Sequence, residues 1–526
     1  EPGDPARRVR AEFLRSLLLQ HPGTPPMHEK GLRLSGAWIE GALDLEGCRI
    51  GRDIGLVDCV FDASLVLRAA VIDSLYLDGS SLPGLVAERL EARGDVYLRG
   101  AVVEGAVVLA GARLRGEFVA DGAAVTSVGE VAIDAARLVA GGNVLLRGAV
   151  VTGGVRLAGA DIGADLMATG ARITRPGAAA LEAEGLRTRG DVALRLAEIE
   201  GTVALVGARV AGDCDFTGGS FSEAEDTAIT LARATIEGAF ILRDGARVDG
   251  VLNLNGASAG ALVDHPDAWP AAGNLKLNHF VYGAILGASA EASVRLSWLA
   301  RQNPARWGED FWPHPYEQLS AALLDMGHDE DARRVLIEKE RLQRRARRAR
   351  VGRGPWRAVL AIKDGLLYLT VGFGRVPLLA FLWLLLIWLG GAGLHAAVAY
   401  HDALRPNVPV FLRAPEWVLC DVERGTRLFV PSLGTEREGL AAPGQSQLAC
   451  FRDQPEAASY PRFNSWIYSL DVLLPGMEVG QQSYWAPDIR KPWGAAGRVV
   501  LYFQVLTGWA LSLLAVAGFS GIVKSR

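Results

Sequence analysis

Cysteine, aromatic residues and net charge are all scarce in this chain, and each shortage excludes a class of protein. Five cysteines among 526 residues are too few for a disulfide scaffold, and no CxxC or Cys/His pair has metal-ligand spacing. Aromatic residues make up 7%, so the hydrophobic half of the sequence is mainly Ala, Val, Leu and Ile. A net charge of −4 argues against general nucleic-acid binding. The polar first residues contain no signal-peptide core, so we do not expect the first domain to be exported.

An 11-residue repeat dominates the first half of the chain. It starts with Leu32, Leu34, Ala37 and Ile39, and matching copies recur as far as residues 275–282. Within each copy, period-2 pairs of apolar residues alternate with Gly-rich corners, which is typical of short strands joined by turns. One unit is too short to bury its own side chains, so equivalent residues must stack on successive coils. The pattern predicts a right-handed parallel β-helix over residues 31–283, pentapeptide-like, with 11-residue half-coils and about ten coils.

The interruptions and the ends of the repeat carry further predictions. Irregular steps near 118–131, 166–181 and 214–229, and a longer excursion at 260–273, are expected to be side loops, where a protein partner could bind. The open end of a β-helix must be covered, and residues 1–30 are predicted to form a helical cap. Residues 5–20 in that cap read as an amphipathic helix. Its apolar side consists of Val9, Phe13, Leu14, Leu17 and Leu18.

Two cysteines occupy equivalent positions in neighbouring copies of the repeat. Cys48 and Cys59 stand 11 residues apart, where other copies carry apolar residues. A free cysteine in a core usually behaves as a small hydrophobic residue. We therefore interpret the pair as buried packing residues and predict no metal site.

Residues 284–357 are predicted to form a helical neck. A helix over 315–327 is followed by a second helix from about Asp329, which makes an αα-hairpin. The second helix runs into an arginine-rich stretch just before an apolar segment, and we interpret this stretch as a site for anionic lipid headgroups; a solvated charge run is the alternative. Its arginines are Arg341, Arg344, Arg345, Arg347, Arg348, Arg350 and Arg353. Residues 358–375 are too charged to span and are expected to lie along the inner membrane interface.

Two segments are long and apolar enough to span a membrane. Residues 376–400 and 498–526 are assigned to transmembrane helices; the core of each contains no charged residue. The positive-inside rule places the arginine run and both chain ends in the cytoplasm, so residues 401–497 face outward. Cys420 and Cys450 would then lie in an oxidising compartment, and we predict a disulfide between them.

The segment before the second span resembles a re-entrant loop. Residues 463–482 contain an aromatic-rich apolar stretch of about a dozen residues, too short to cross a bilayer, followed by an irregular Gly-containing stretch. This is the layout of two-span pore-loop cation channels, although GMEVGQ replaces the potassium-filter signature. The alternative is an aromatic hairpin on the headgroups, with Asp471 paired locally. The candidate site residues are Tyr468, Ser469, Asp471, Pro475, Gly476, Glu478, Gly480 and Gln481.

Several segments together resemble a known group of bacterial β-helix membrane proteins. The segments are GLRLSGAWIEGALDLEGCRI, WPHPYEQLSAALLDMGHDEDARRVLIEKERLQRR, YSLDVLLPGMEVGQ and LTGWALSLLAVAGFSGIV. They are similar to pentapeptide-repeat-like proteins commonly labelled "membrane-associated oxidoreductase". The resemblance covers nearly the whole chain and implies a bacterial, actinobacterial-like, inner-membrane protein.

The residues themselves give the oxidoreductase label little support. Gly372-Phe373-Gly374 lacks the third glycine of a dinucleotide motif, there is no CxxCH, and His395 is alone in its span. We therefore predict no cofactor, no metal and no catalytic residue. The leading hypothesis is a non-enzymatic, homo-oligomeric membrane protein whose cytoplasmic β-helix is a scaffold or sensor. The alternatives are a two-span pore-loop-like ion channel and, second, an oxidoreductase as the label suggests.

Overall fold

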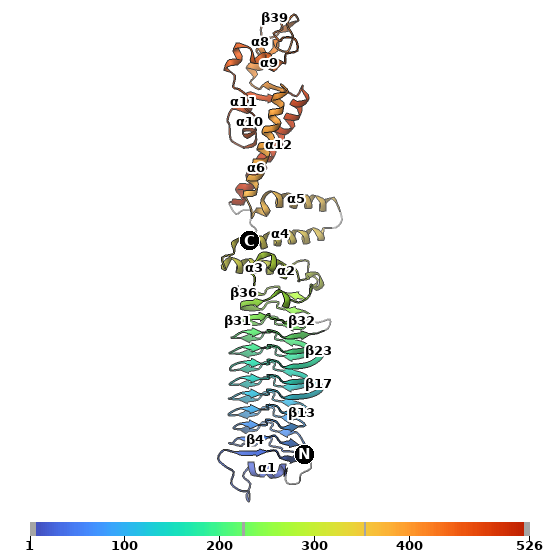
Figure 1. Cartoon of the computed structure of the whole chain (residues 1–526), viewed down its shortest axis with the longest axis vertical. Coiled ribbons are helices and arrows are strands. Elements are labelled where there is room, and N and C mark those ends of the chain that lie inside the picture. Colours follow the sequence, from blue (N-terminus) through green and yellow to red (C-terminus); the bar gives the residue numbers. More distant parts are fainter. Residues whose placement is uncertain (1–6, 224–226, 352–353, 520–526) are drawn as a thin grey trace. The chain divides into compact units, whose positions relative to one another are not determined.

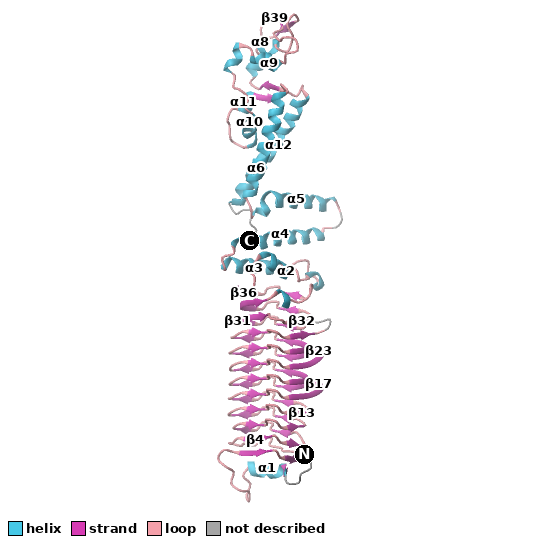
Figure 2. Cartoon of the chain, viewed as in Figure 1, coloured by secondary structure: helices cyan, strands magenta, loops and turns pink. Residues whose placement is uncertain are grey.

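The computed structural model describes residues 7–223, 227–351 and 354–519, without the side chains of 128–130 and 518–519. The chain forms two compact units, Glu1–Gln343 and Arg344–Arg526, which are described separately. The first unit is a parallel β-helix, as predicted, followed by a helical neck; the β-helix has about 11 coils where the repeat count gave about ten. The second is helical and contains two helices long and apolar enough to cross a membrane (Figure 2).

The β-helix consists of two parallel sheets whose strands stack coil on coil (Figure 1). The first sheet contains β1 (Arg8–Arg10), β3 (Trp38–Glu40), β5 (Val60–Phe61), β6 (Leu65–Val66), β9 (Ser81–Leu82), β10 (Leu85–Val86), β13 (Val102–Val103), β14 (Val107–Val108), β17 (Ala124–Asp134), β20 (Val150–Arg156), β23 (Arg172–Glu182), β26 (Glu198–Ala204), β29 (Ser220–Ser222), β30 (Ile229–Thr230), β32 (Arg247–Asp249), β33 (Leu252–Asn253) and β35 (Leu275–Lys276). The second contains β2 (Leu32–Ser35), β4 (Ile54–Val57), β7 (Val71–Ile72), β8 (Leu75–Tyr76), β11 (Glu91–Ala92), β12 (Val96–Tyr97), β15 (Arg113–Leu114), β16 (Phe118–Val119), β18 (Val139–Ala140), β19 (Val144–Leu145), β21 (Asp161–Ile162), β22 (Leu166–Met167), β24 (Arg187–Thr188), β25 (Val192–Ala193), β27 (Arg209–Val210), β28 (Cys214–Asp215), β31 (Thr235–Leu242), β34 (Ser258–Asp264) and β36 (Val281–Ile285).

The core of the β-helix is the set of inward residues that the repeat predicts. Equivalent residues pair in register on successive coils, which puts apolar side chains into continuous buried columns. One such column is Leu65, Leu85, Val107, Ile133, Val155 and Leu181. Cys59 is buried, and its burial raises the pKa of the thiol, whereas Cys48 is only half-buried.

A ladder of carboxylate and amide side chains follows one corner of the β-helix. The side-chain oxygen at each rung accepts the backbone N–H of a residue on the next coil, which supplies an acceptor where the strand ladder ends. The rungs are Asp95, Asn143, Asp165, Asp191 and Asp213. Glu117 lies between the first two rungs and accepts the side-chain amide of Asn143 instead of a backbone N–H. From Glu117 onward, successive positions of the ladder are 26 and 22 residues apart in alternation. Gly116 and Gly212 are required here, because a Cβ at either would overlap the carboxylate of the preceding rung.

The alternation arises because every second coil is four residues longer, and we call each longer segment an outgrowth. The outgrowths differ from the side loops that the sequence predicted. The segments near 118–131 and 166–181 are not loops: β17 and β23 run through them as 11-residue strands with local register shifts. Both strands are visible as longer ribbons on one side of the β-helix in Figure 1. The third irregular segment, 214–229, includes residues outside the described part of the chain. Glu223 there accepts a hydrogen bond from the backbone N–H of Gly177, which links two outgrowths.

The N-terminal end of the β-helix is covered by less helix than predicted. The helix α1 begins at Ala11 and ends at Leu18, and the residues before it form β1, which pairs with β3. Leu14 and Leu18 are buried as expected, but Phe13 is 49% exposed. The difference has a physical cause: strand pairing satisfies the backbone of Arg8–Arg10 against the first coil, so the helix begins later.

The C-terminal end is closed by a buried ion pair, so the excursion at 260–273 is part of the cap and not a free side loop. The guanidinium of Arg295, on α2 (Ala292–Leu299), lies 2.8 and 2.9 Å from the two carboxylate oxygens of Asp264, at the end of β34. The indole N–H of Trp269 donates to the same carboxylate at 2.7 Å. A short 3₁₀ turn, Pro266–Ala268, connects Asp264 to Trp269 along the chain.

The remaining helices belong to the neck and to the second unit. In the neck, α3 (His314–Asp325) and α4 (Asp329–Arg350) form a helical hairpin; the Lys339 ammonium lies 2.9 Å from the Glu317 carboxylate across it. The other helices are α5 (Pro355–Val371), α6 (Leu378–Tyr400), α7 (Pro409–Leu412), α8 (Pro415–Leu419), α9 (Gln447–Arg452), α10 (Ser465–Leu473), α11 (Gln481–Tyr484) and α12 (Pro492–Phe519), with two antiparallel strand pairs, β37 (Leu404–Pro406) with β40 (Trp485–Pro487) and β38 (Arg427–Val430) with β39 (Thr435–Glu438). The helices α6 and α12 are the two candidate spans.

Candidate functional site

The nine-residue helix α10 packs against both candidate spans, α6 and α12 (Figure 1). Asn464 caps it, because its side-chain oxygen accepts the backbone N–H groups of Trp466 and Ile467. At about 13 Å, the helix is less than half as long as the hydrocarbon core is thick. It can therefore enter a bilayer beside the spans without crossing it.

The end of α10 lies against the middle of α12. Leu473 belongs to one apolar cluster with side chains of α6 and α12. A Cβ at Gly508 would overlap the backbone carbonyl of Leu473, so the glycine allows this approach. Gly508 is about 24 Å along the helix from Pro492 and about 16 Å from Phe519. The chain thus turns back at mid-length of this span.

Three buried polar side chains join α6, α10 and α12. His395 Nε2 lies 3.0 Å from Gln504 Oε1, an acceptor, and the Gln504 amide donates to Ser469 Oγ at 2.8 Å. The Ser469 hydroxyl donates in turn to the backbone carbonyl of Trp388 at 2.9 Å. All three side chains are at most 1% exposed. In a bilayer such bonds hold helices together, because lipid offers polar groups no partner.

Two polar atoms beside this cluster have no hydrogen-bond partner within the described part of the chain. They are Nδ1 of His395 and the hydroxyl of Tyr468. The two rings are in edge-to-face contact, with centroids 4.8 Å apart, and Phe463 packs against Tyr468 as well. An unsatisfied buried polar group costs about 1–3 kcal/mol. A water molecule or polar ligand that reached this point would recover that free energy.

The chain after α10 returns through residues 474–482, and Asp471 holds this return in place. Its Oδ1 accepts the backbone N–H of Val479 at 2.9 Å, and its Oδ2 accepts that of Gln482 at 2.7 Å. The buried side chain of Gln481 accepts the backbone N–H of Asn464 at 3.0 Å. Asp471 is therefore paired within its own chain. The sequence allowed two interpretations of this carboxylate, one facing a pore and one paired locally, and the contacts correspond to the second.

The turn of this return segment is exposed. Pro475 is followed by Gly476 with φ 81°, and Gly480 has φ 83°, a region that favours glycine. Glu478 lies between the two glycines, is exposed, and forms no ion pair or side-chain hydrogen bond within the described residues. Its neighbours Met477 and Val479 are 45% and 49% exposed. The segment of the candidate site thus presents one carboxylate between apolar side chains.

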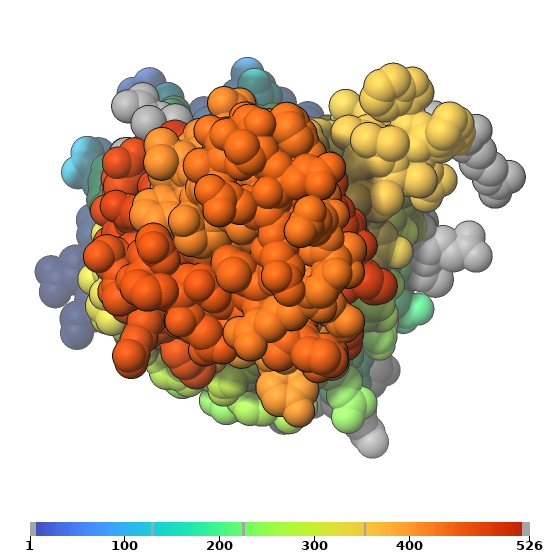
Figure 3. All heavy atoms as spheres, turned by 90° about the horizontal axis from the view of Figure 1, so that it is seen from above, coloured from blue at the N-terminus to red at the C-terminus, as the bar shows by residue number. Residues whose placement is uncertain are grey.

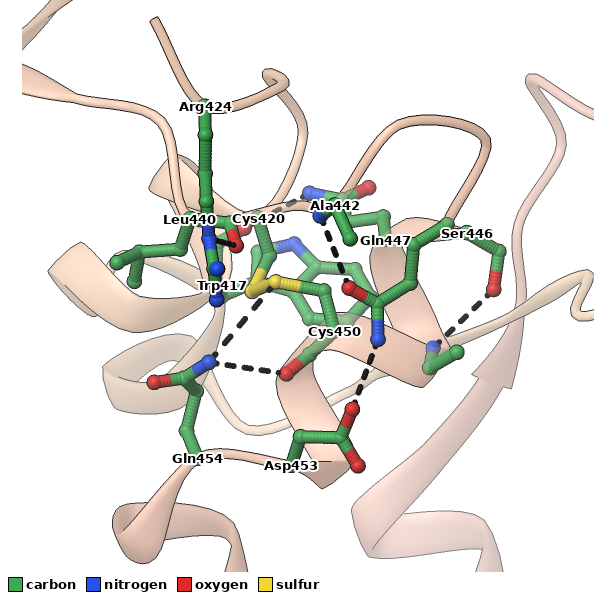
Figure 4. Close-up of a disulfide and its surroundings, with 12 residues drawn as sticks. Trp417, Cys420, Arg424, Leu440, Ala442, Ser446, Gln447, Cys450, Asp453 and Gln454 are labelled. Carbon is green, nitrogen blue, oxygen red and sulfur yellow. Dashed lines mark hydrogen bonds between the residues drawn. A yellow bond between two sulfur atoms is a disulfide. The ribbon is translucent and has the colours of Figure 1, made fainter.

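Cys420 and Cys450 form a disulfide, with their Cα atoms 5.6 Å apart (Figure 4). It links the residue after α8 to α9 across a sequence separation of 30. Both cysteines are buried beside Trp417, whose backbone carbonyl accepts a hydrogen bond from the Gln447 amide at 2.9 Å. Gln454 donates to the Cys450 carbonyl at 3.1 Å. These contacts hold α8 and α9 together in residues 401–497.

Two of the arginines predicted to bind lipid headgroups are used inside the second unit. Arg344 lies 3.2 Å from Asp364, a buried carboxylate on α5, and Arg348 pairs with the same carboxylate. The guanidinium of Arg344 also lies 4.8 Å from the ring centroid of Phe373. These arginines fix α5 against the last turns of α4.

The other predicted headgroup arginines differ in their surroundings. Arg341 lies 3.4 Å from the Glu338 carboxylate, one turn earlier on α4. Arg345, Arg347 and Arg350 are exposed. Arg353 lies outside the described residues. The end of α4 is therefore a positively charged surface even after two arginines have paired with α5.

The helix α5 exposes an apolar stripe and buries a carboxylate. An amphipathic helix of a soluble protein does the opposite, because it buries its apolar face. The buried side of α5 carries Asp364 and Val371, whereas its exposed apolar residues recur every three or four positions and so share one face. The exposed residues are Trp356, Val359, Ile362, Leu366 and Leu369. The stripe ends at the short turn that leads into α6.

The sequence indicated some of these residues and not others. Ser469, Asp471 and Gln481 were singled out from the re-entrant layout, and His395 was noted only as a lone histidine. Gln504 was missed, although an uncharged amide inside an otherwise apolar span is a signal in itself. The pairing of Asp364 with the arginines was missed because it depends on how two helices fold back.

The fold defines the class of protein as a parallel β-helix followed by a helical unit with two candidate membrane spans. No family model, curated protein or solved structure matches the chain. The resemblance to pentapeptide-repeat-like membrane proteins and its oxidoreductase label therefore remain predictions from the sequence motifs.

Proposed function

We propose that this chain is a non-enzymatic, membrane-anchored scaffold. The two spans hold the β-helix at the cytoplasmic face of a bacterial inner membrane, and the chain acts as a homo-oligomer. The observation that carries the proposal is the exposed apolar stripe of α5, directly ahead of the first candidate span. A stripe of this kind is costly in water and stable at the headgroup boundary, where an in-plane helix buries its apolar face.

The charge of the end of α4 supports the same orientation. Arg345, Arg347 and Arg350 are exposed close to the start of α5 in the sequence. Arginines near a membrane favour its anionic cytoplasmic surface by about 1 kcal/mol each. We infer that these arginines contact lipid phosphates while α5 lies in the interface. The disulfide of residues 401–497 fits an oxidising compartment on the other side.

The wall of the β-helix supports a scaffold role. The repeated carboxylates of the corner ladder are used by backbone N–H groups of the next coil, so their recurrence has a structural reason. The outgrowths at β17 and β23 add extended strands along one side. We propose this side as the surface for a protein partner.

Spin labels on two adjacent residues of α5 test the membrane placement. In full-length protein in liposomes with anionic lipid, a label at Ile362→Cys is expected to be accessible to oxygen and protected from a water-soluble nickel chelate. A label at Ala361→Cys serves as the matched control, since Ala361 is exposed but lies off the apolar stripe on the helix, and the opposite accessibility is expected. Equal exposure of both positions to the chelate would rule out an interfacial α5.

Labelling of intact cells tests the orientation. With Cys48→Ser as background, an impermeant maleimide is expected to label Thr435→Cys on the β38–β39 hairpin in intact cells. Glu104→Cys on the β-helix should react only after permeabilisation. Labelling of Glu104→Cys in intact cells would contradict a cytoplasmic scaffold.

A further inference from the structure

Glu478 lies deep along the candidate spans of the second unit, a position that a scaffold does not require. Val479, the next residue, is hydrogen-bonded to Asp471, which lies one half-turn before the end of α10. That end contacts Gly508, at mid-length of α12. Glu478 therefore lies at the level of the middle of a candidate span, not at its outer end.

A carboxylate at that depth cannot face hydrocarbon. A charged side chain at the centre of a membrane-spanning helix costs about 2.5–3.5 kcal/mol even on the mildest scale, and such residues face a bundle interior or water. In one chain Glu478 is exposed and its flanking residues, Met477 and Val479, are half-exposed. The surface around it is thus too polar for lipid and too apolar for water.

A second copy of this chain fits that surface. Apolar side chains of the same segment, Trp466, Ile467, Met477 and Val479, are exposed and can pack against a neighbouring subunit. Identical subunits around an axis would bring the same carboxylate together from each copy. Seen end-on, the residues of the second unit that face the viewer form a closed surface without a visible opening (Figure 3).

We propose that copies of this chain assemble around an axis lined by residues 474–480, and that their Glu478 carboxylates form a ring that passes cations. Rings of acidic side chains are a recurring basis of cation selectivity. Asp471 is a positioning residue in this arrangement, because both of its oxygens accept backbone N–H groups of the return segment. The inference goes beyond the scaffold and does not depend on what the β-helix binds.

Ion flux through the full-length protein in planar bilayers tests the proposal. The wild-type chain is expected to conduct and to prefer K⁺ over Cl⁻. Glu478→Gln should lower this preference several-fold, Glu478→Asp should retain most of it, and Asp471→Asn should reduce conductance by releasing the return segment. Glu436→Gln, an exposed glutamate on β39, is the matched control and should leave the current unchanged.

Three results would overturn the proposal. One is the absence of conductance from protein whose orientation and reconstitution have been verified. Another is an unchanged ion preference in Glu478→Gln, which is expected to fold because the side chain is exposed. A monomeric mass in lipid nanodiscs would exclude the ring directly. The labelling of Glu104→Cys is independent of all three, so failure here can be told apart from failure of the membrane-anchored scaffold.

Discussion

Replacing Asp264 by Asn leaves a fully buried arginine without its counter-charge. The side chains of Arg295 and Asp264 are 0% and 2% exposed, and the pair closes the C-terminal end of the β-helix. Asn at position 264 keeps an acceptor for the indole N–H of Trp269 but removes the charge that balances Arg295. Arg295 also donates to the Ser289 carbonyl at 2.6 Å, and this bond alone does not neutralise it.

The expected cost follows from this burial. Removal of one partner from a buried ion pair costs about 3–5 kcal/mol, because the other charge remains without compensation. Arg295→Met should cost a similar amount for the same reason. The double variant Asp264→Asn/Arg295→Met should cost clearly less than the sum of the two, since no charge remains buried. Arg172→Gln is the matched control, because Arg172 pairs with Glu198 at the surface, where ion pairs contribute little.

Hydrogen exchange of the full-length protein measures the effect locally. Peptides covering β34 and α2 report the opening of this end, and a loss of 3–5 kcal/mol corresponds to exchange faster by about 150- to 5,000-fold. The control variant should leave the same peptides unchanged. If the two single variants exchange like the control, the pair does not close the end of the β-helix, and the reasoning from burial is wrong.

Three further predictions concern other parts of the chain. Burial lowers the pKa of His314, so the neutral side chain stabilises the fold above its unfolded pKa of about 6.5, and this stability is lost as pH falls through the folded pKa. Urea midpoints measured across pH should show the loss, and His314→Gln should flatten the pH dependence. Gly508→Val should displace α10, because any Cβ there overlaps the Leu473 carbonyl, and should cost about 1–3 kcal/mol by thermal unfolding, whereas Gly390→Ala, with open space around it, should not destabilise. Cys420→Ser should lower the stability of residues 401–497 by about 2–5 kcal/mol, and a reducing agent should have no further effect on that variant.

The β-helix could be predicted from the sequence because its information is local and repeated. Leu65 and Leu85 recur at the spacing of a coil, and stacking is the arrangement that buries both. The same logic failed for the irregular steps. Four extra residues in a coil look like a loop in the sequence, but the β17 strand pairs with β20 on both sides of its register shift. Pairing with the neighbouring coil, which the sequence does not display, keeps the insertion extended.

The polar contacts of the ends and of the candidate site could not be predicted in this way. Arg295 and Asp264 are 31 residues apart, and His395 and Gln504 are 109 apart, so no periodicity connects either pair. What the sequence does show is each polar residue in an apolar setting. Such a residue indicates that a partner exists, and only the folded chain identifies it.

The alternation along the corner ladder sets a unit by which this β-helix can grow. Coils of 22 and 26 residues take turns, so outgrowths on neighbouring coils never coincide, and Gly177 and Glu223 make contact across the plain coil between them. Gain or loss of a single coil would place two plain coils or two enlarged coils side by side and break that contact. Within the alternating part, from Glu117 to Ala239, a duplication or deletion that preserves the wall must therefore involve a pair of coils, about 10 Å of length at the spacing of stacked strands. Between related proteins, the length of the β-helix could thus change by pairs of coils rather than by single coils.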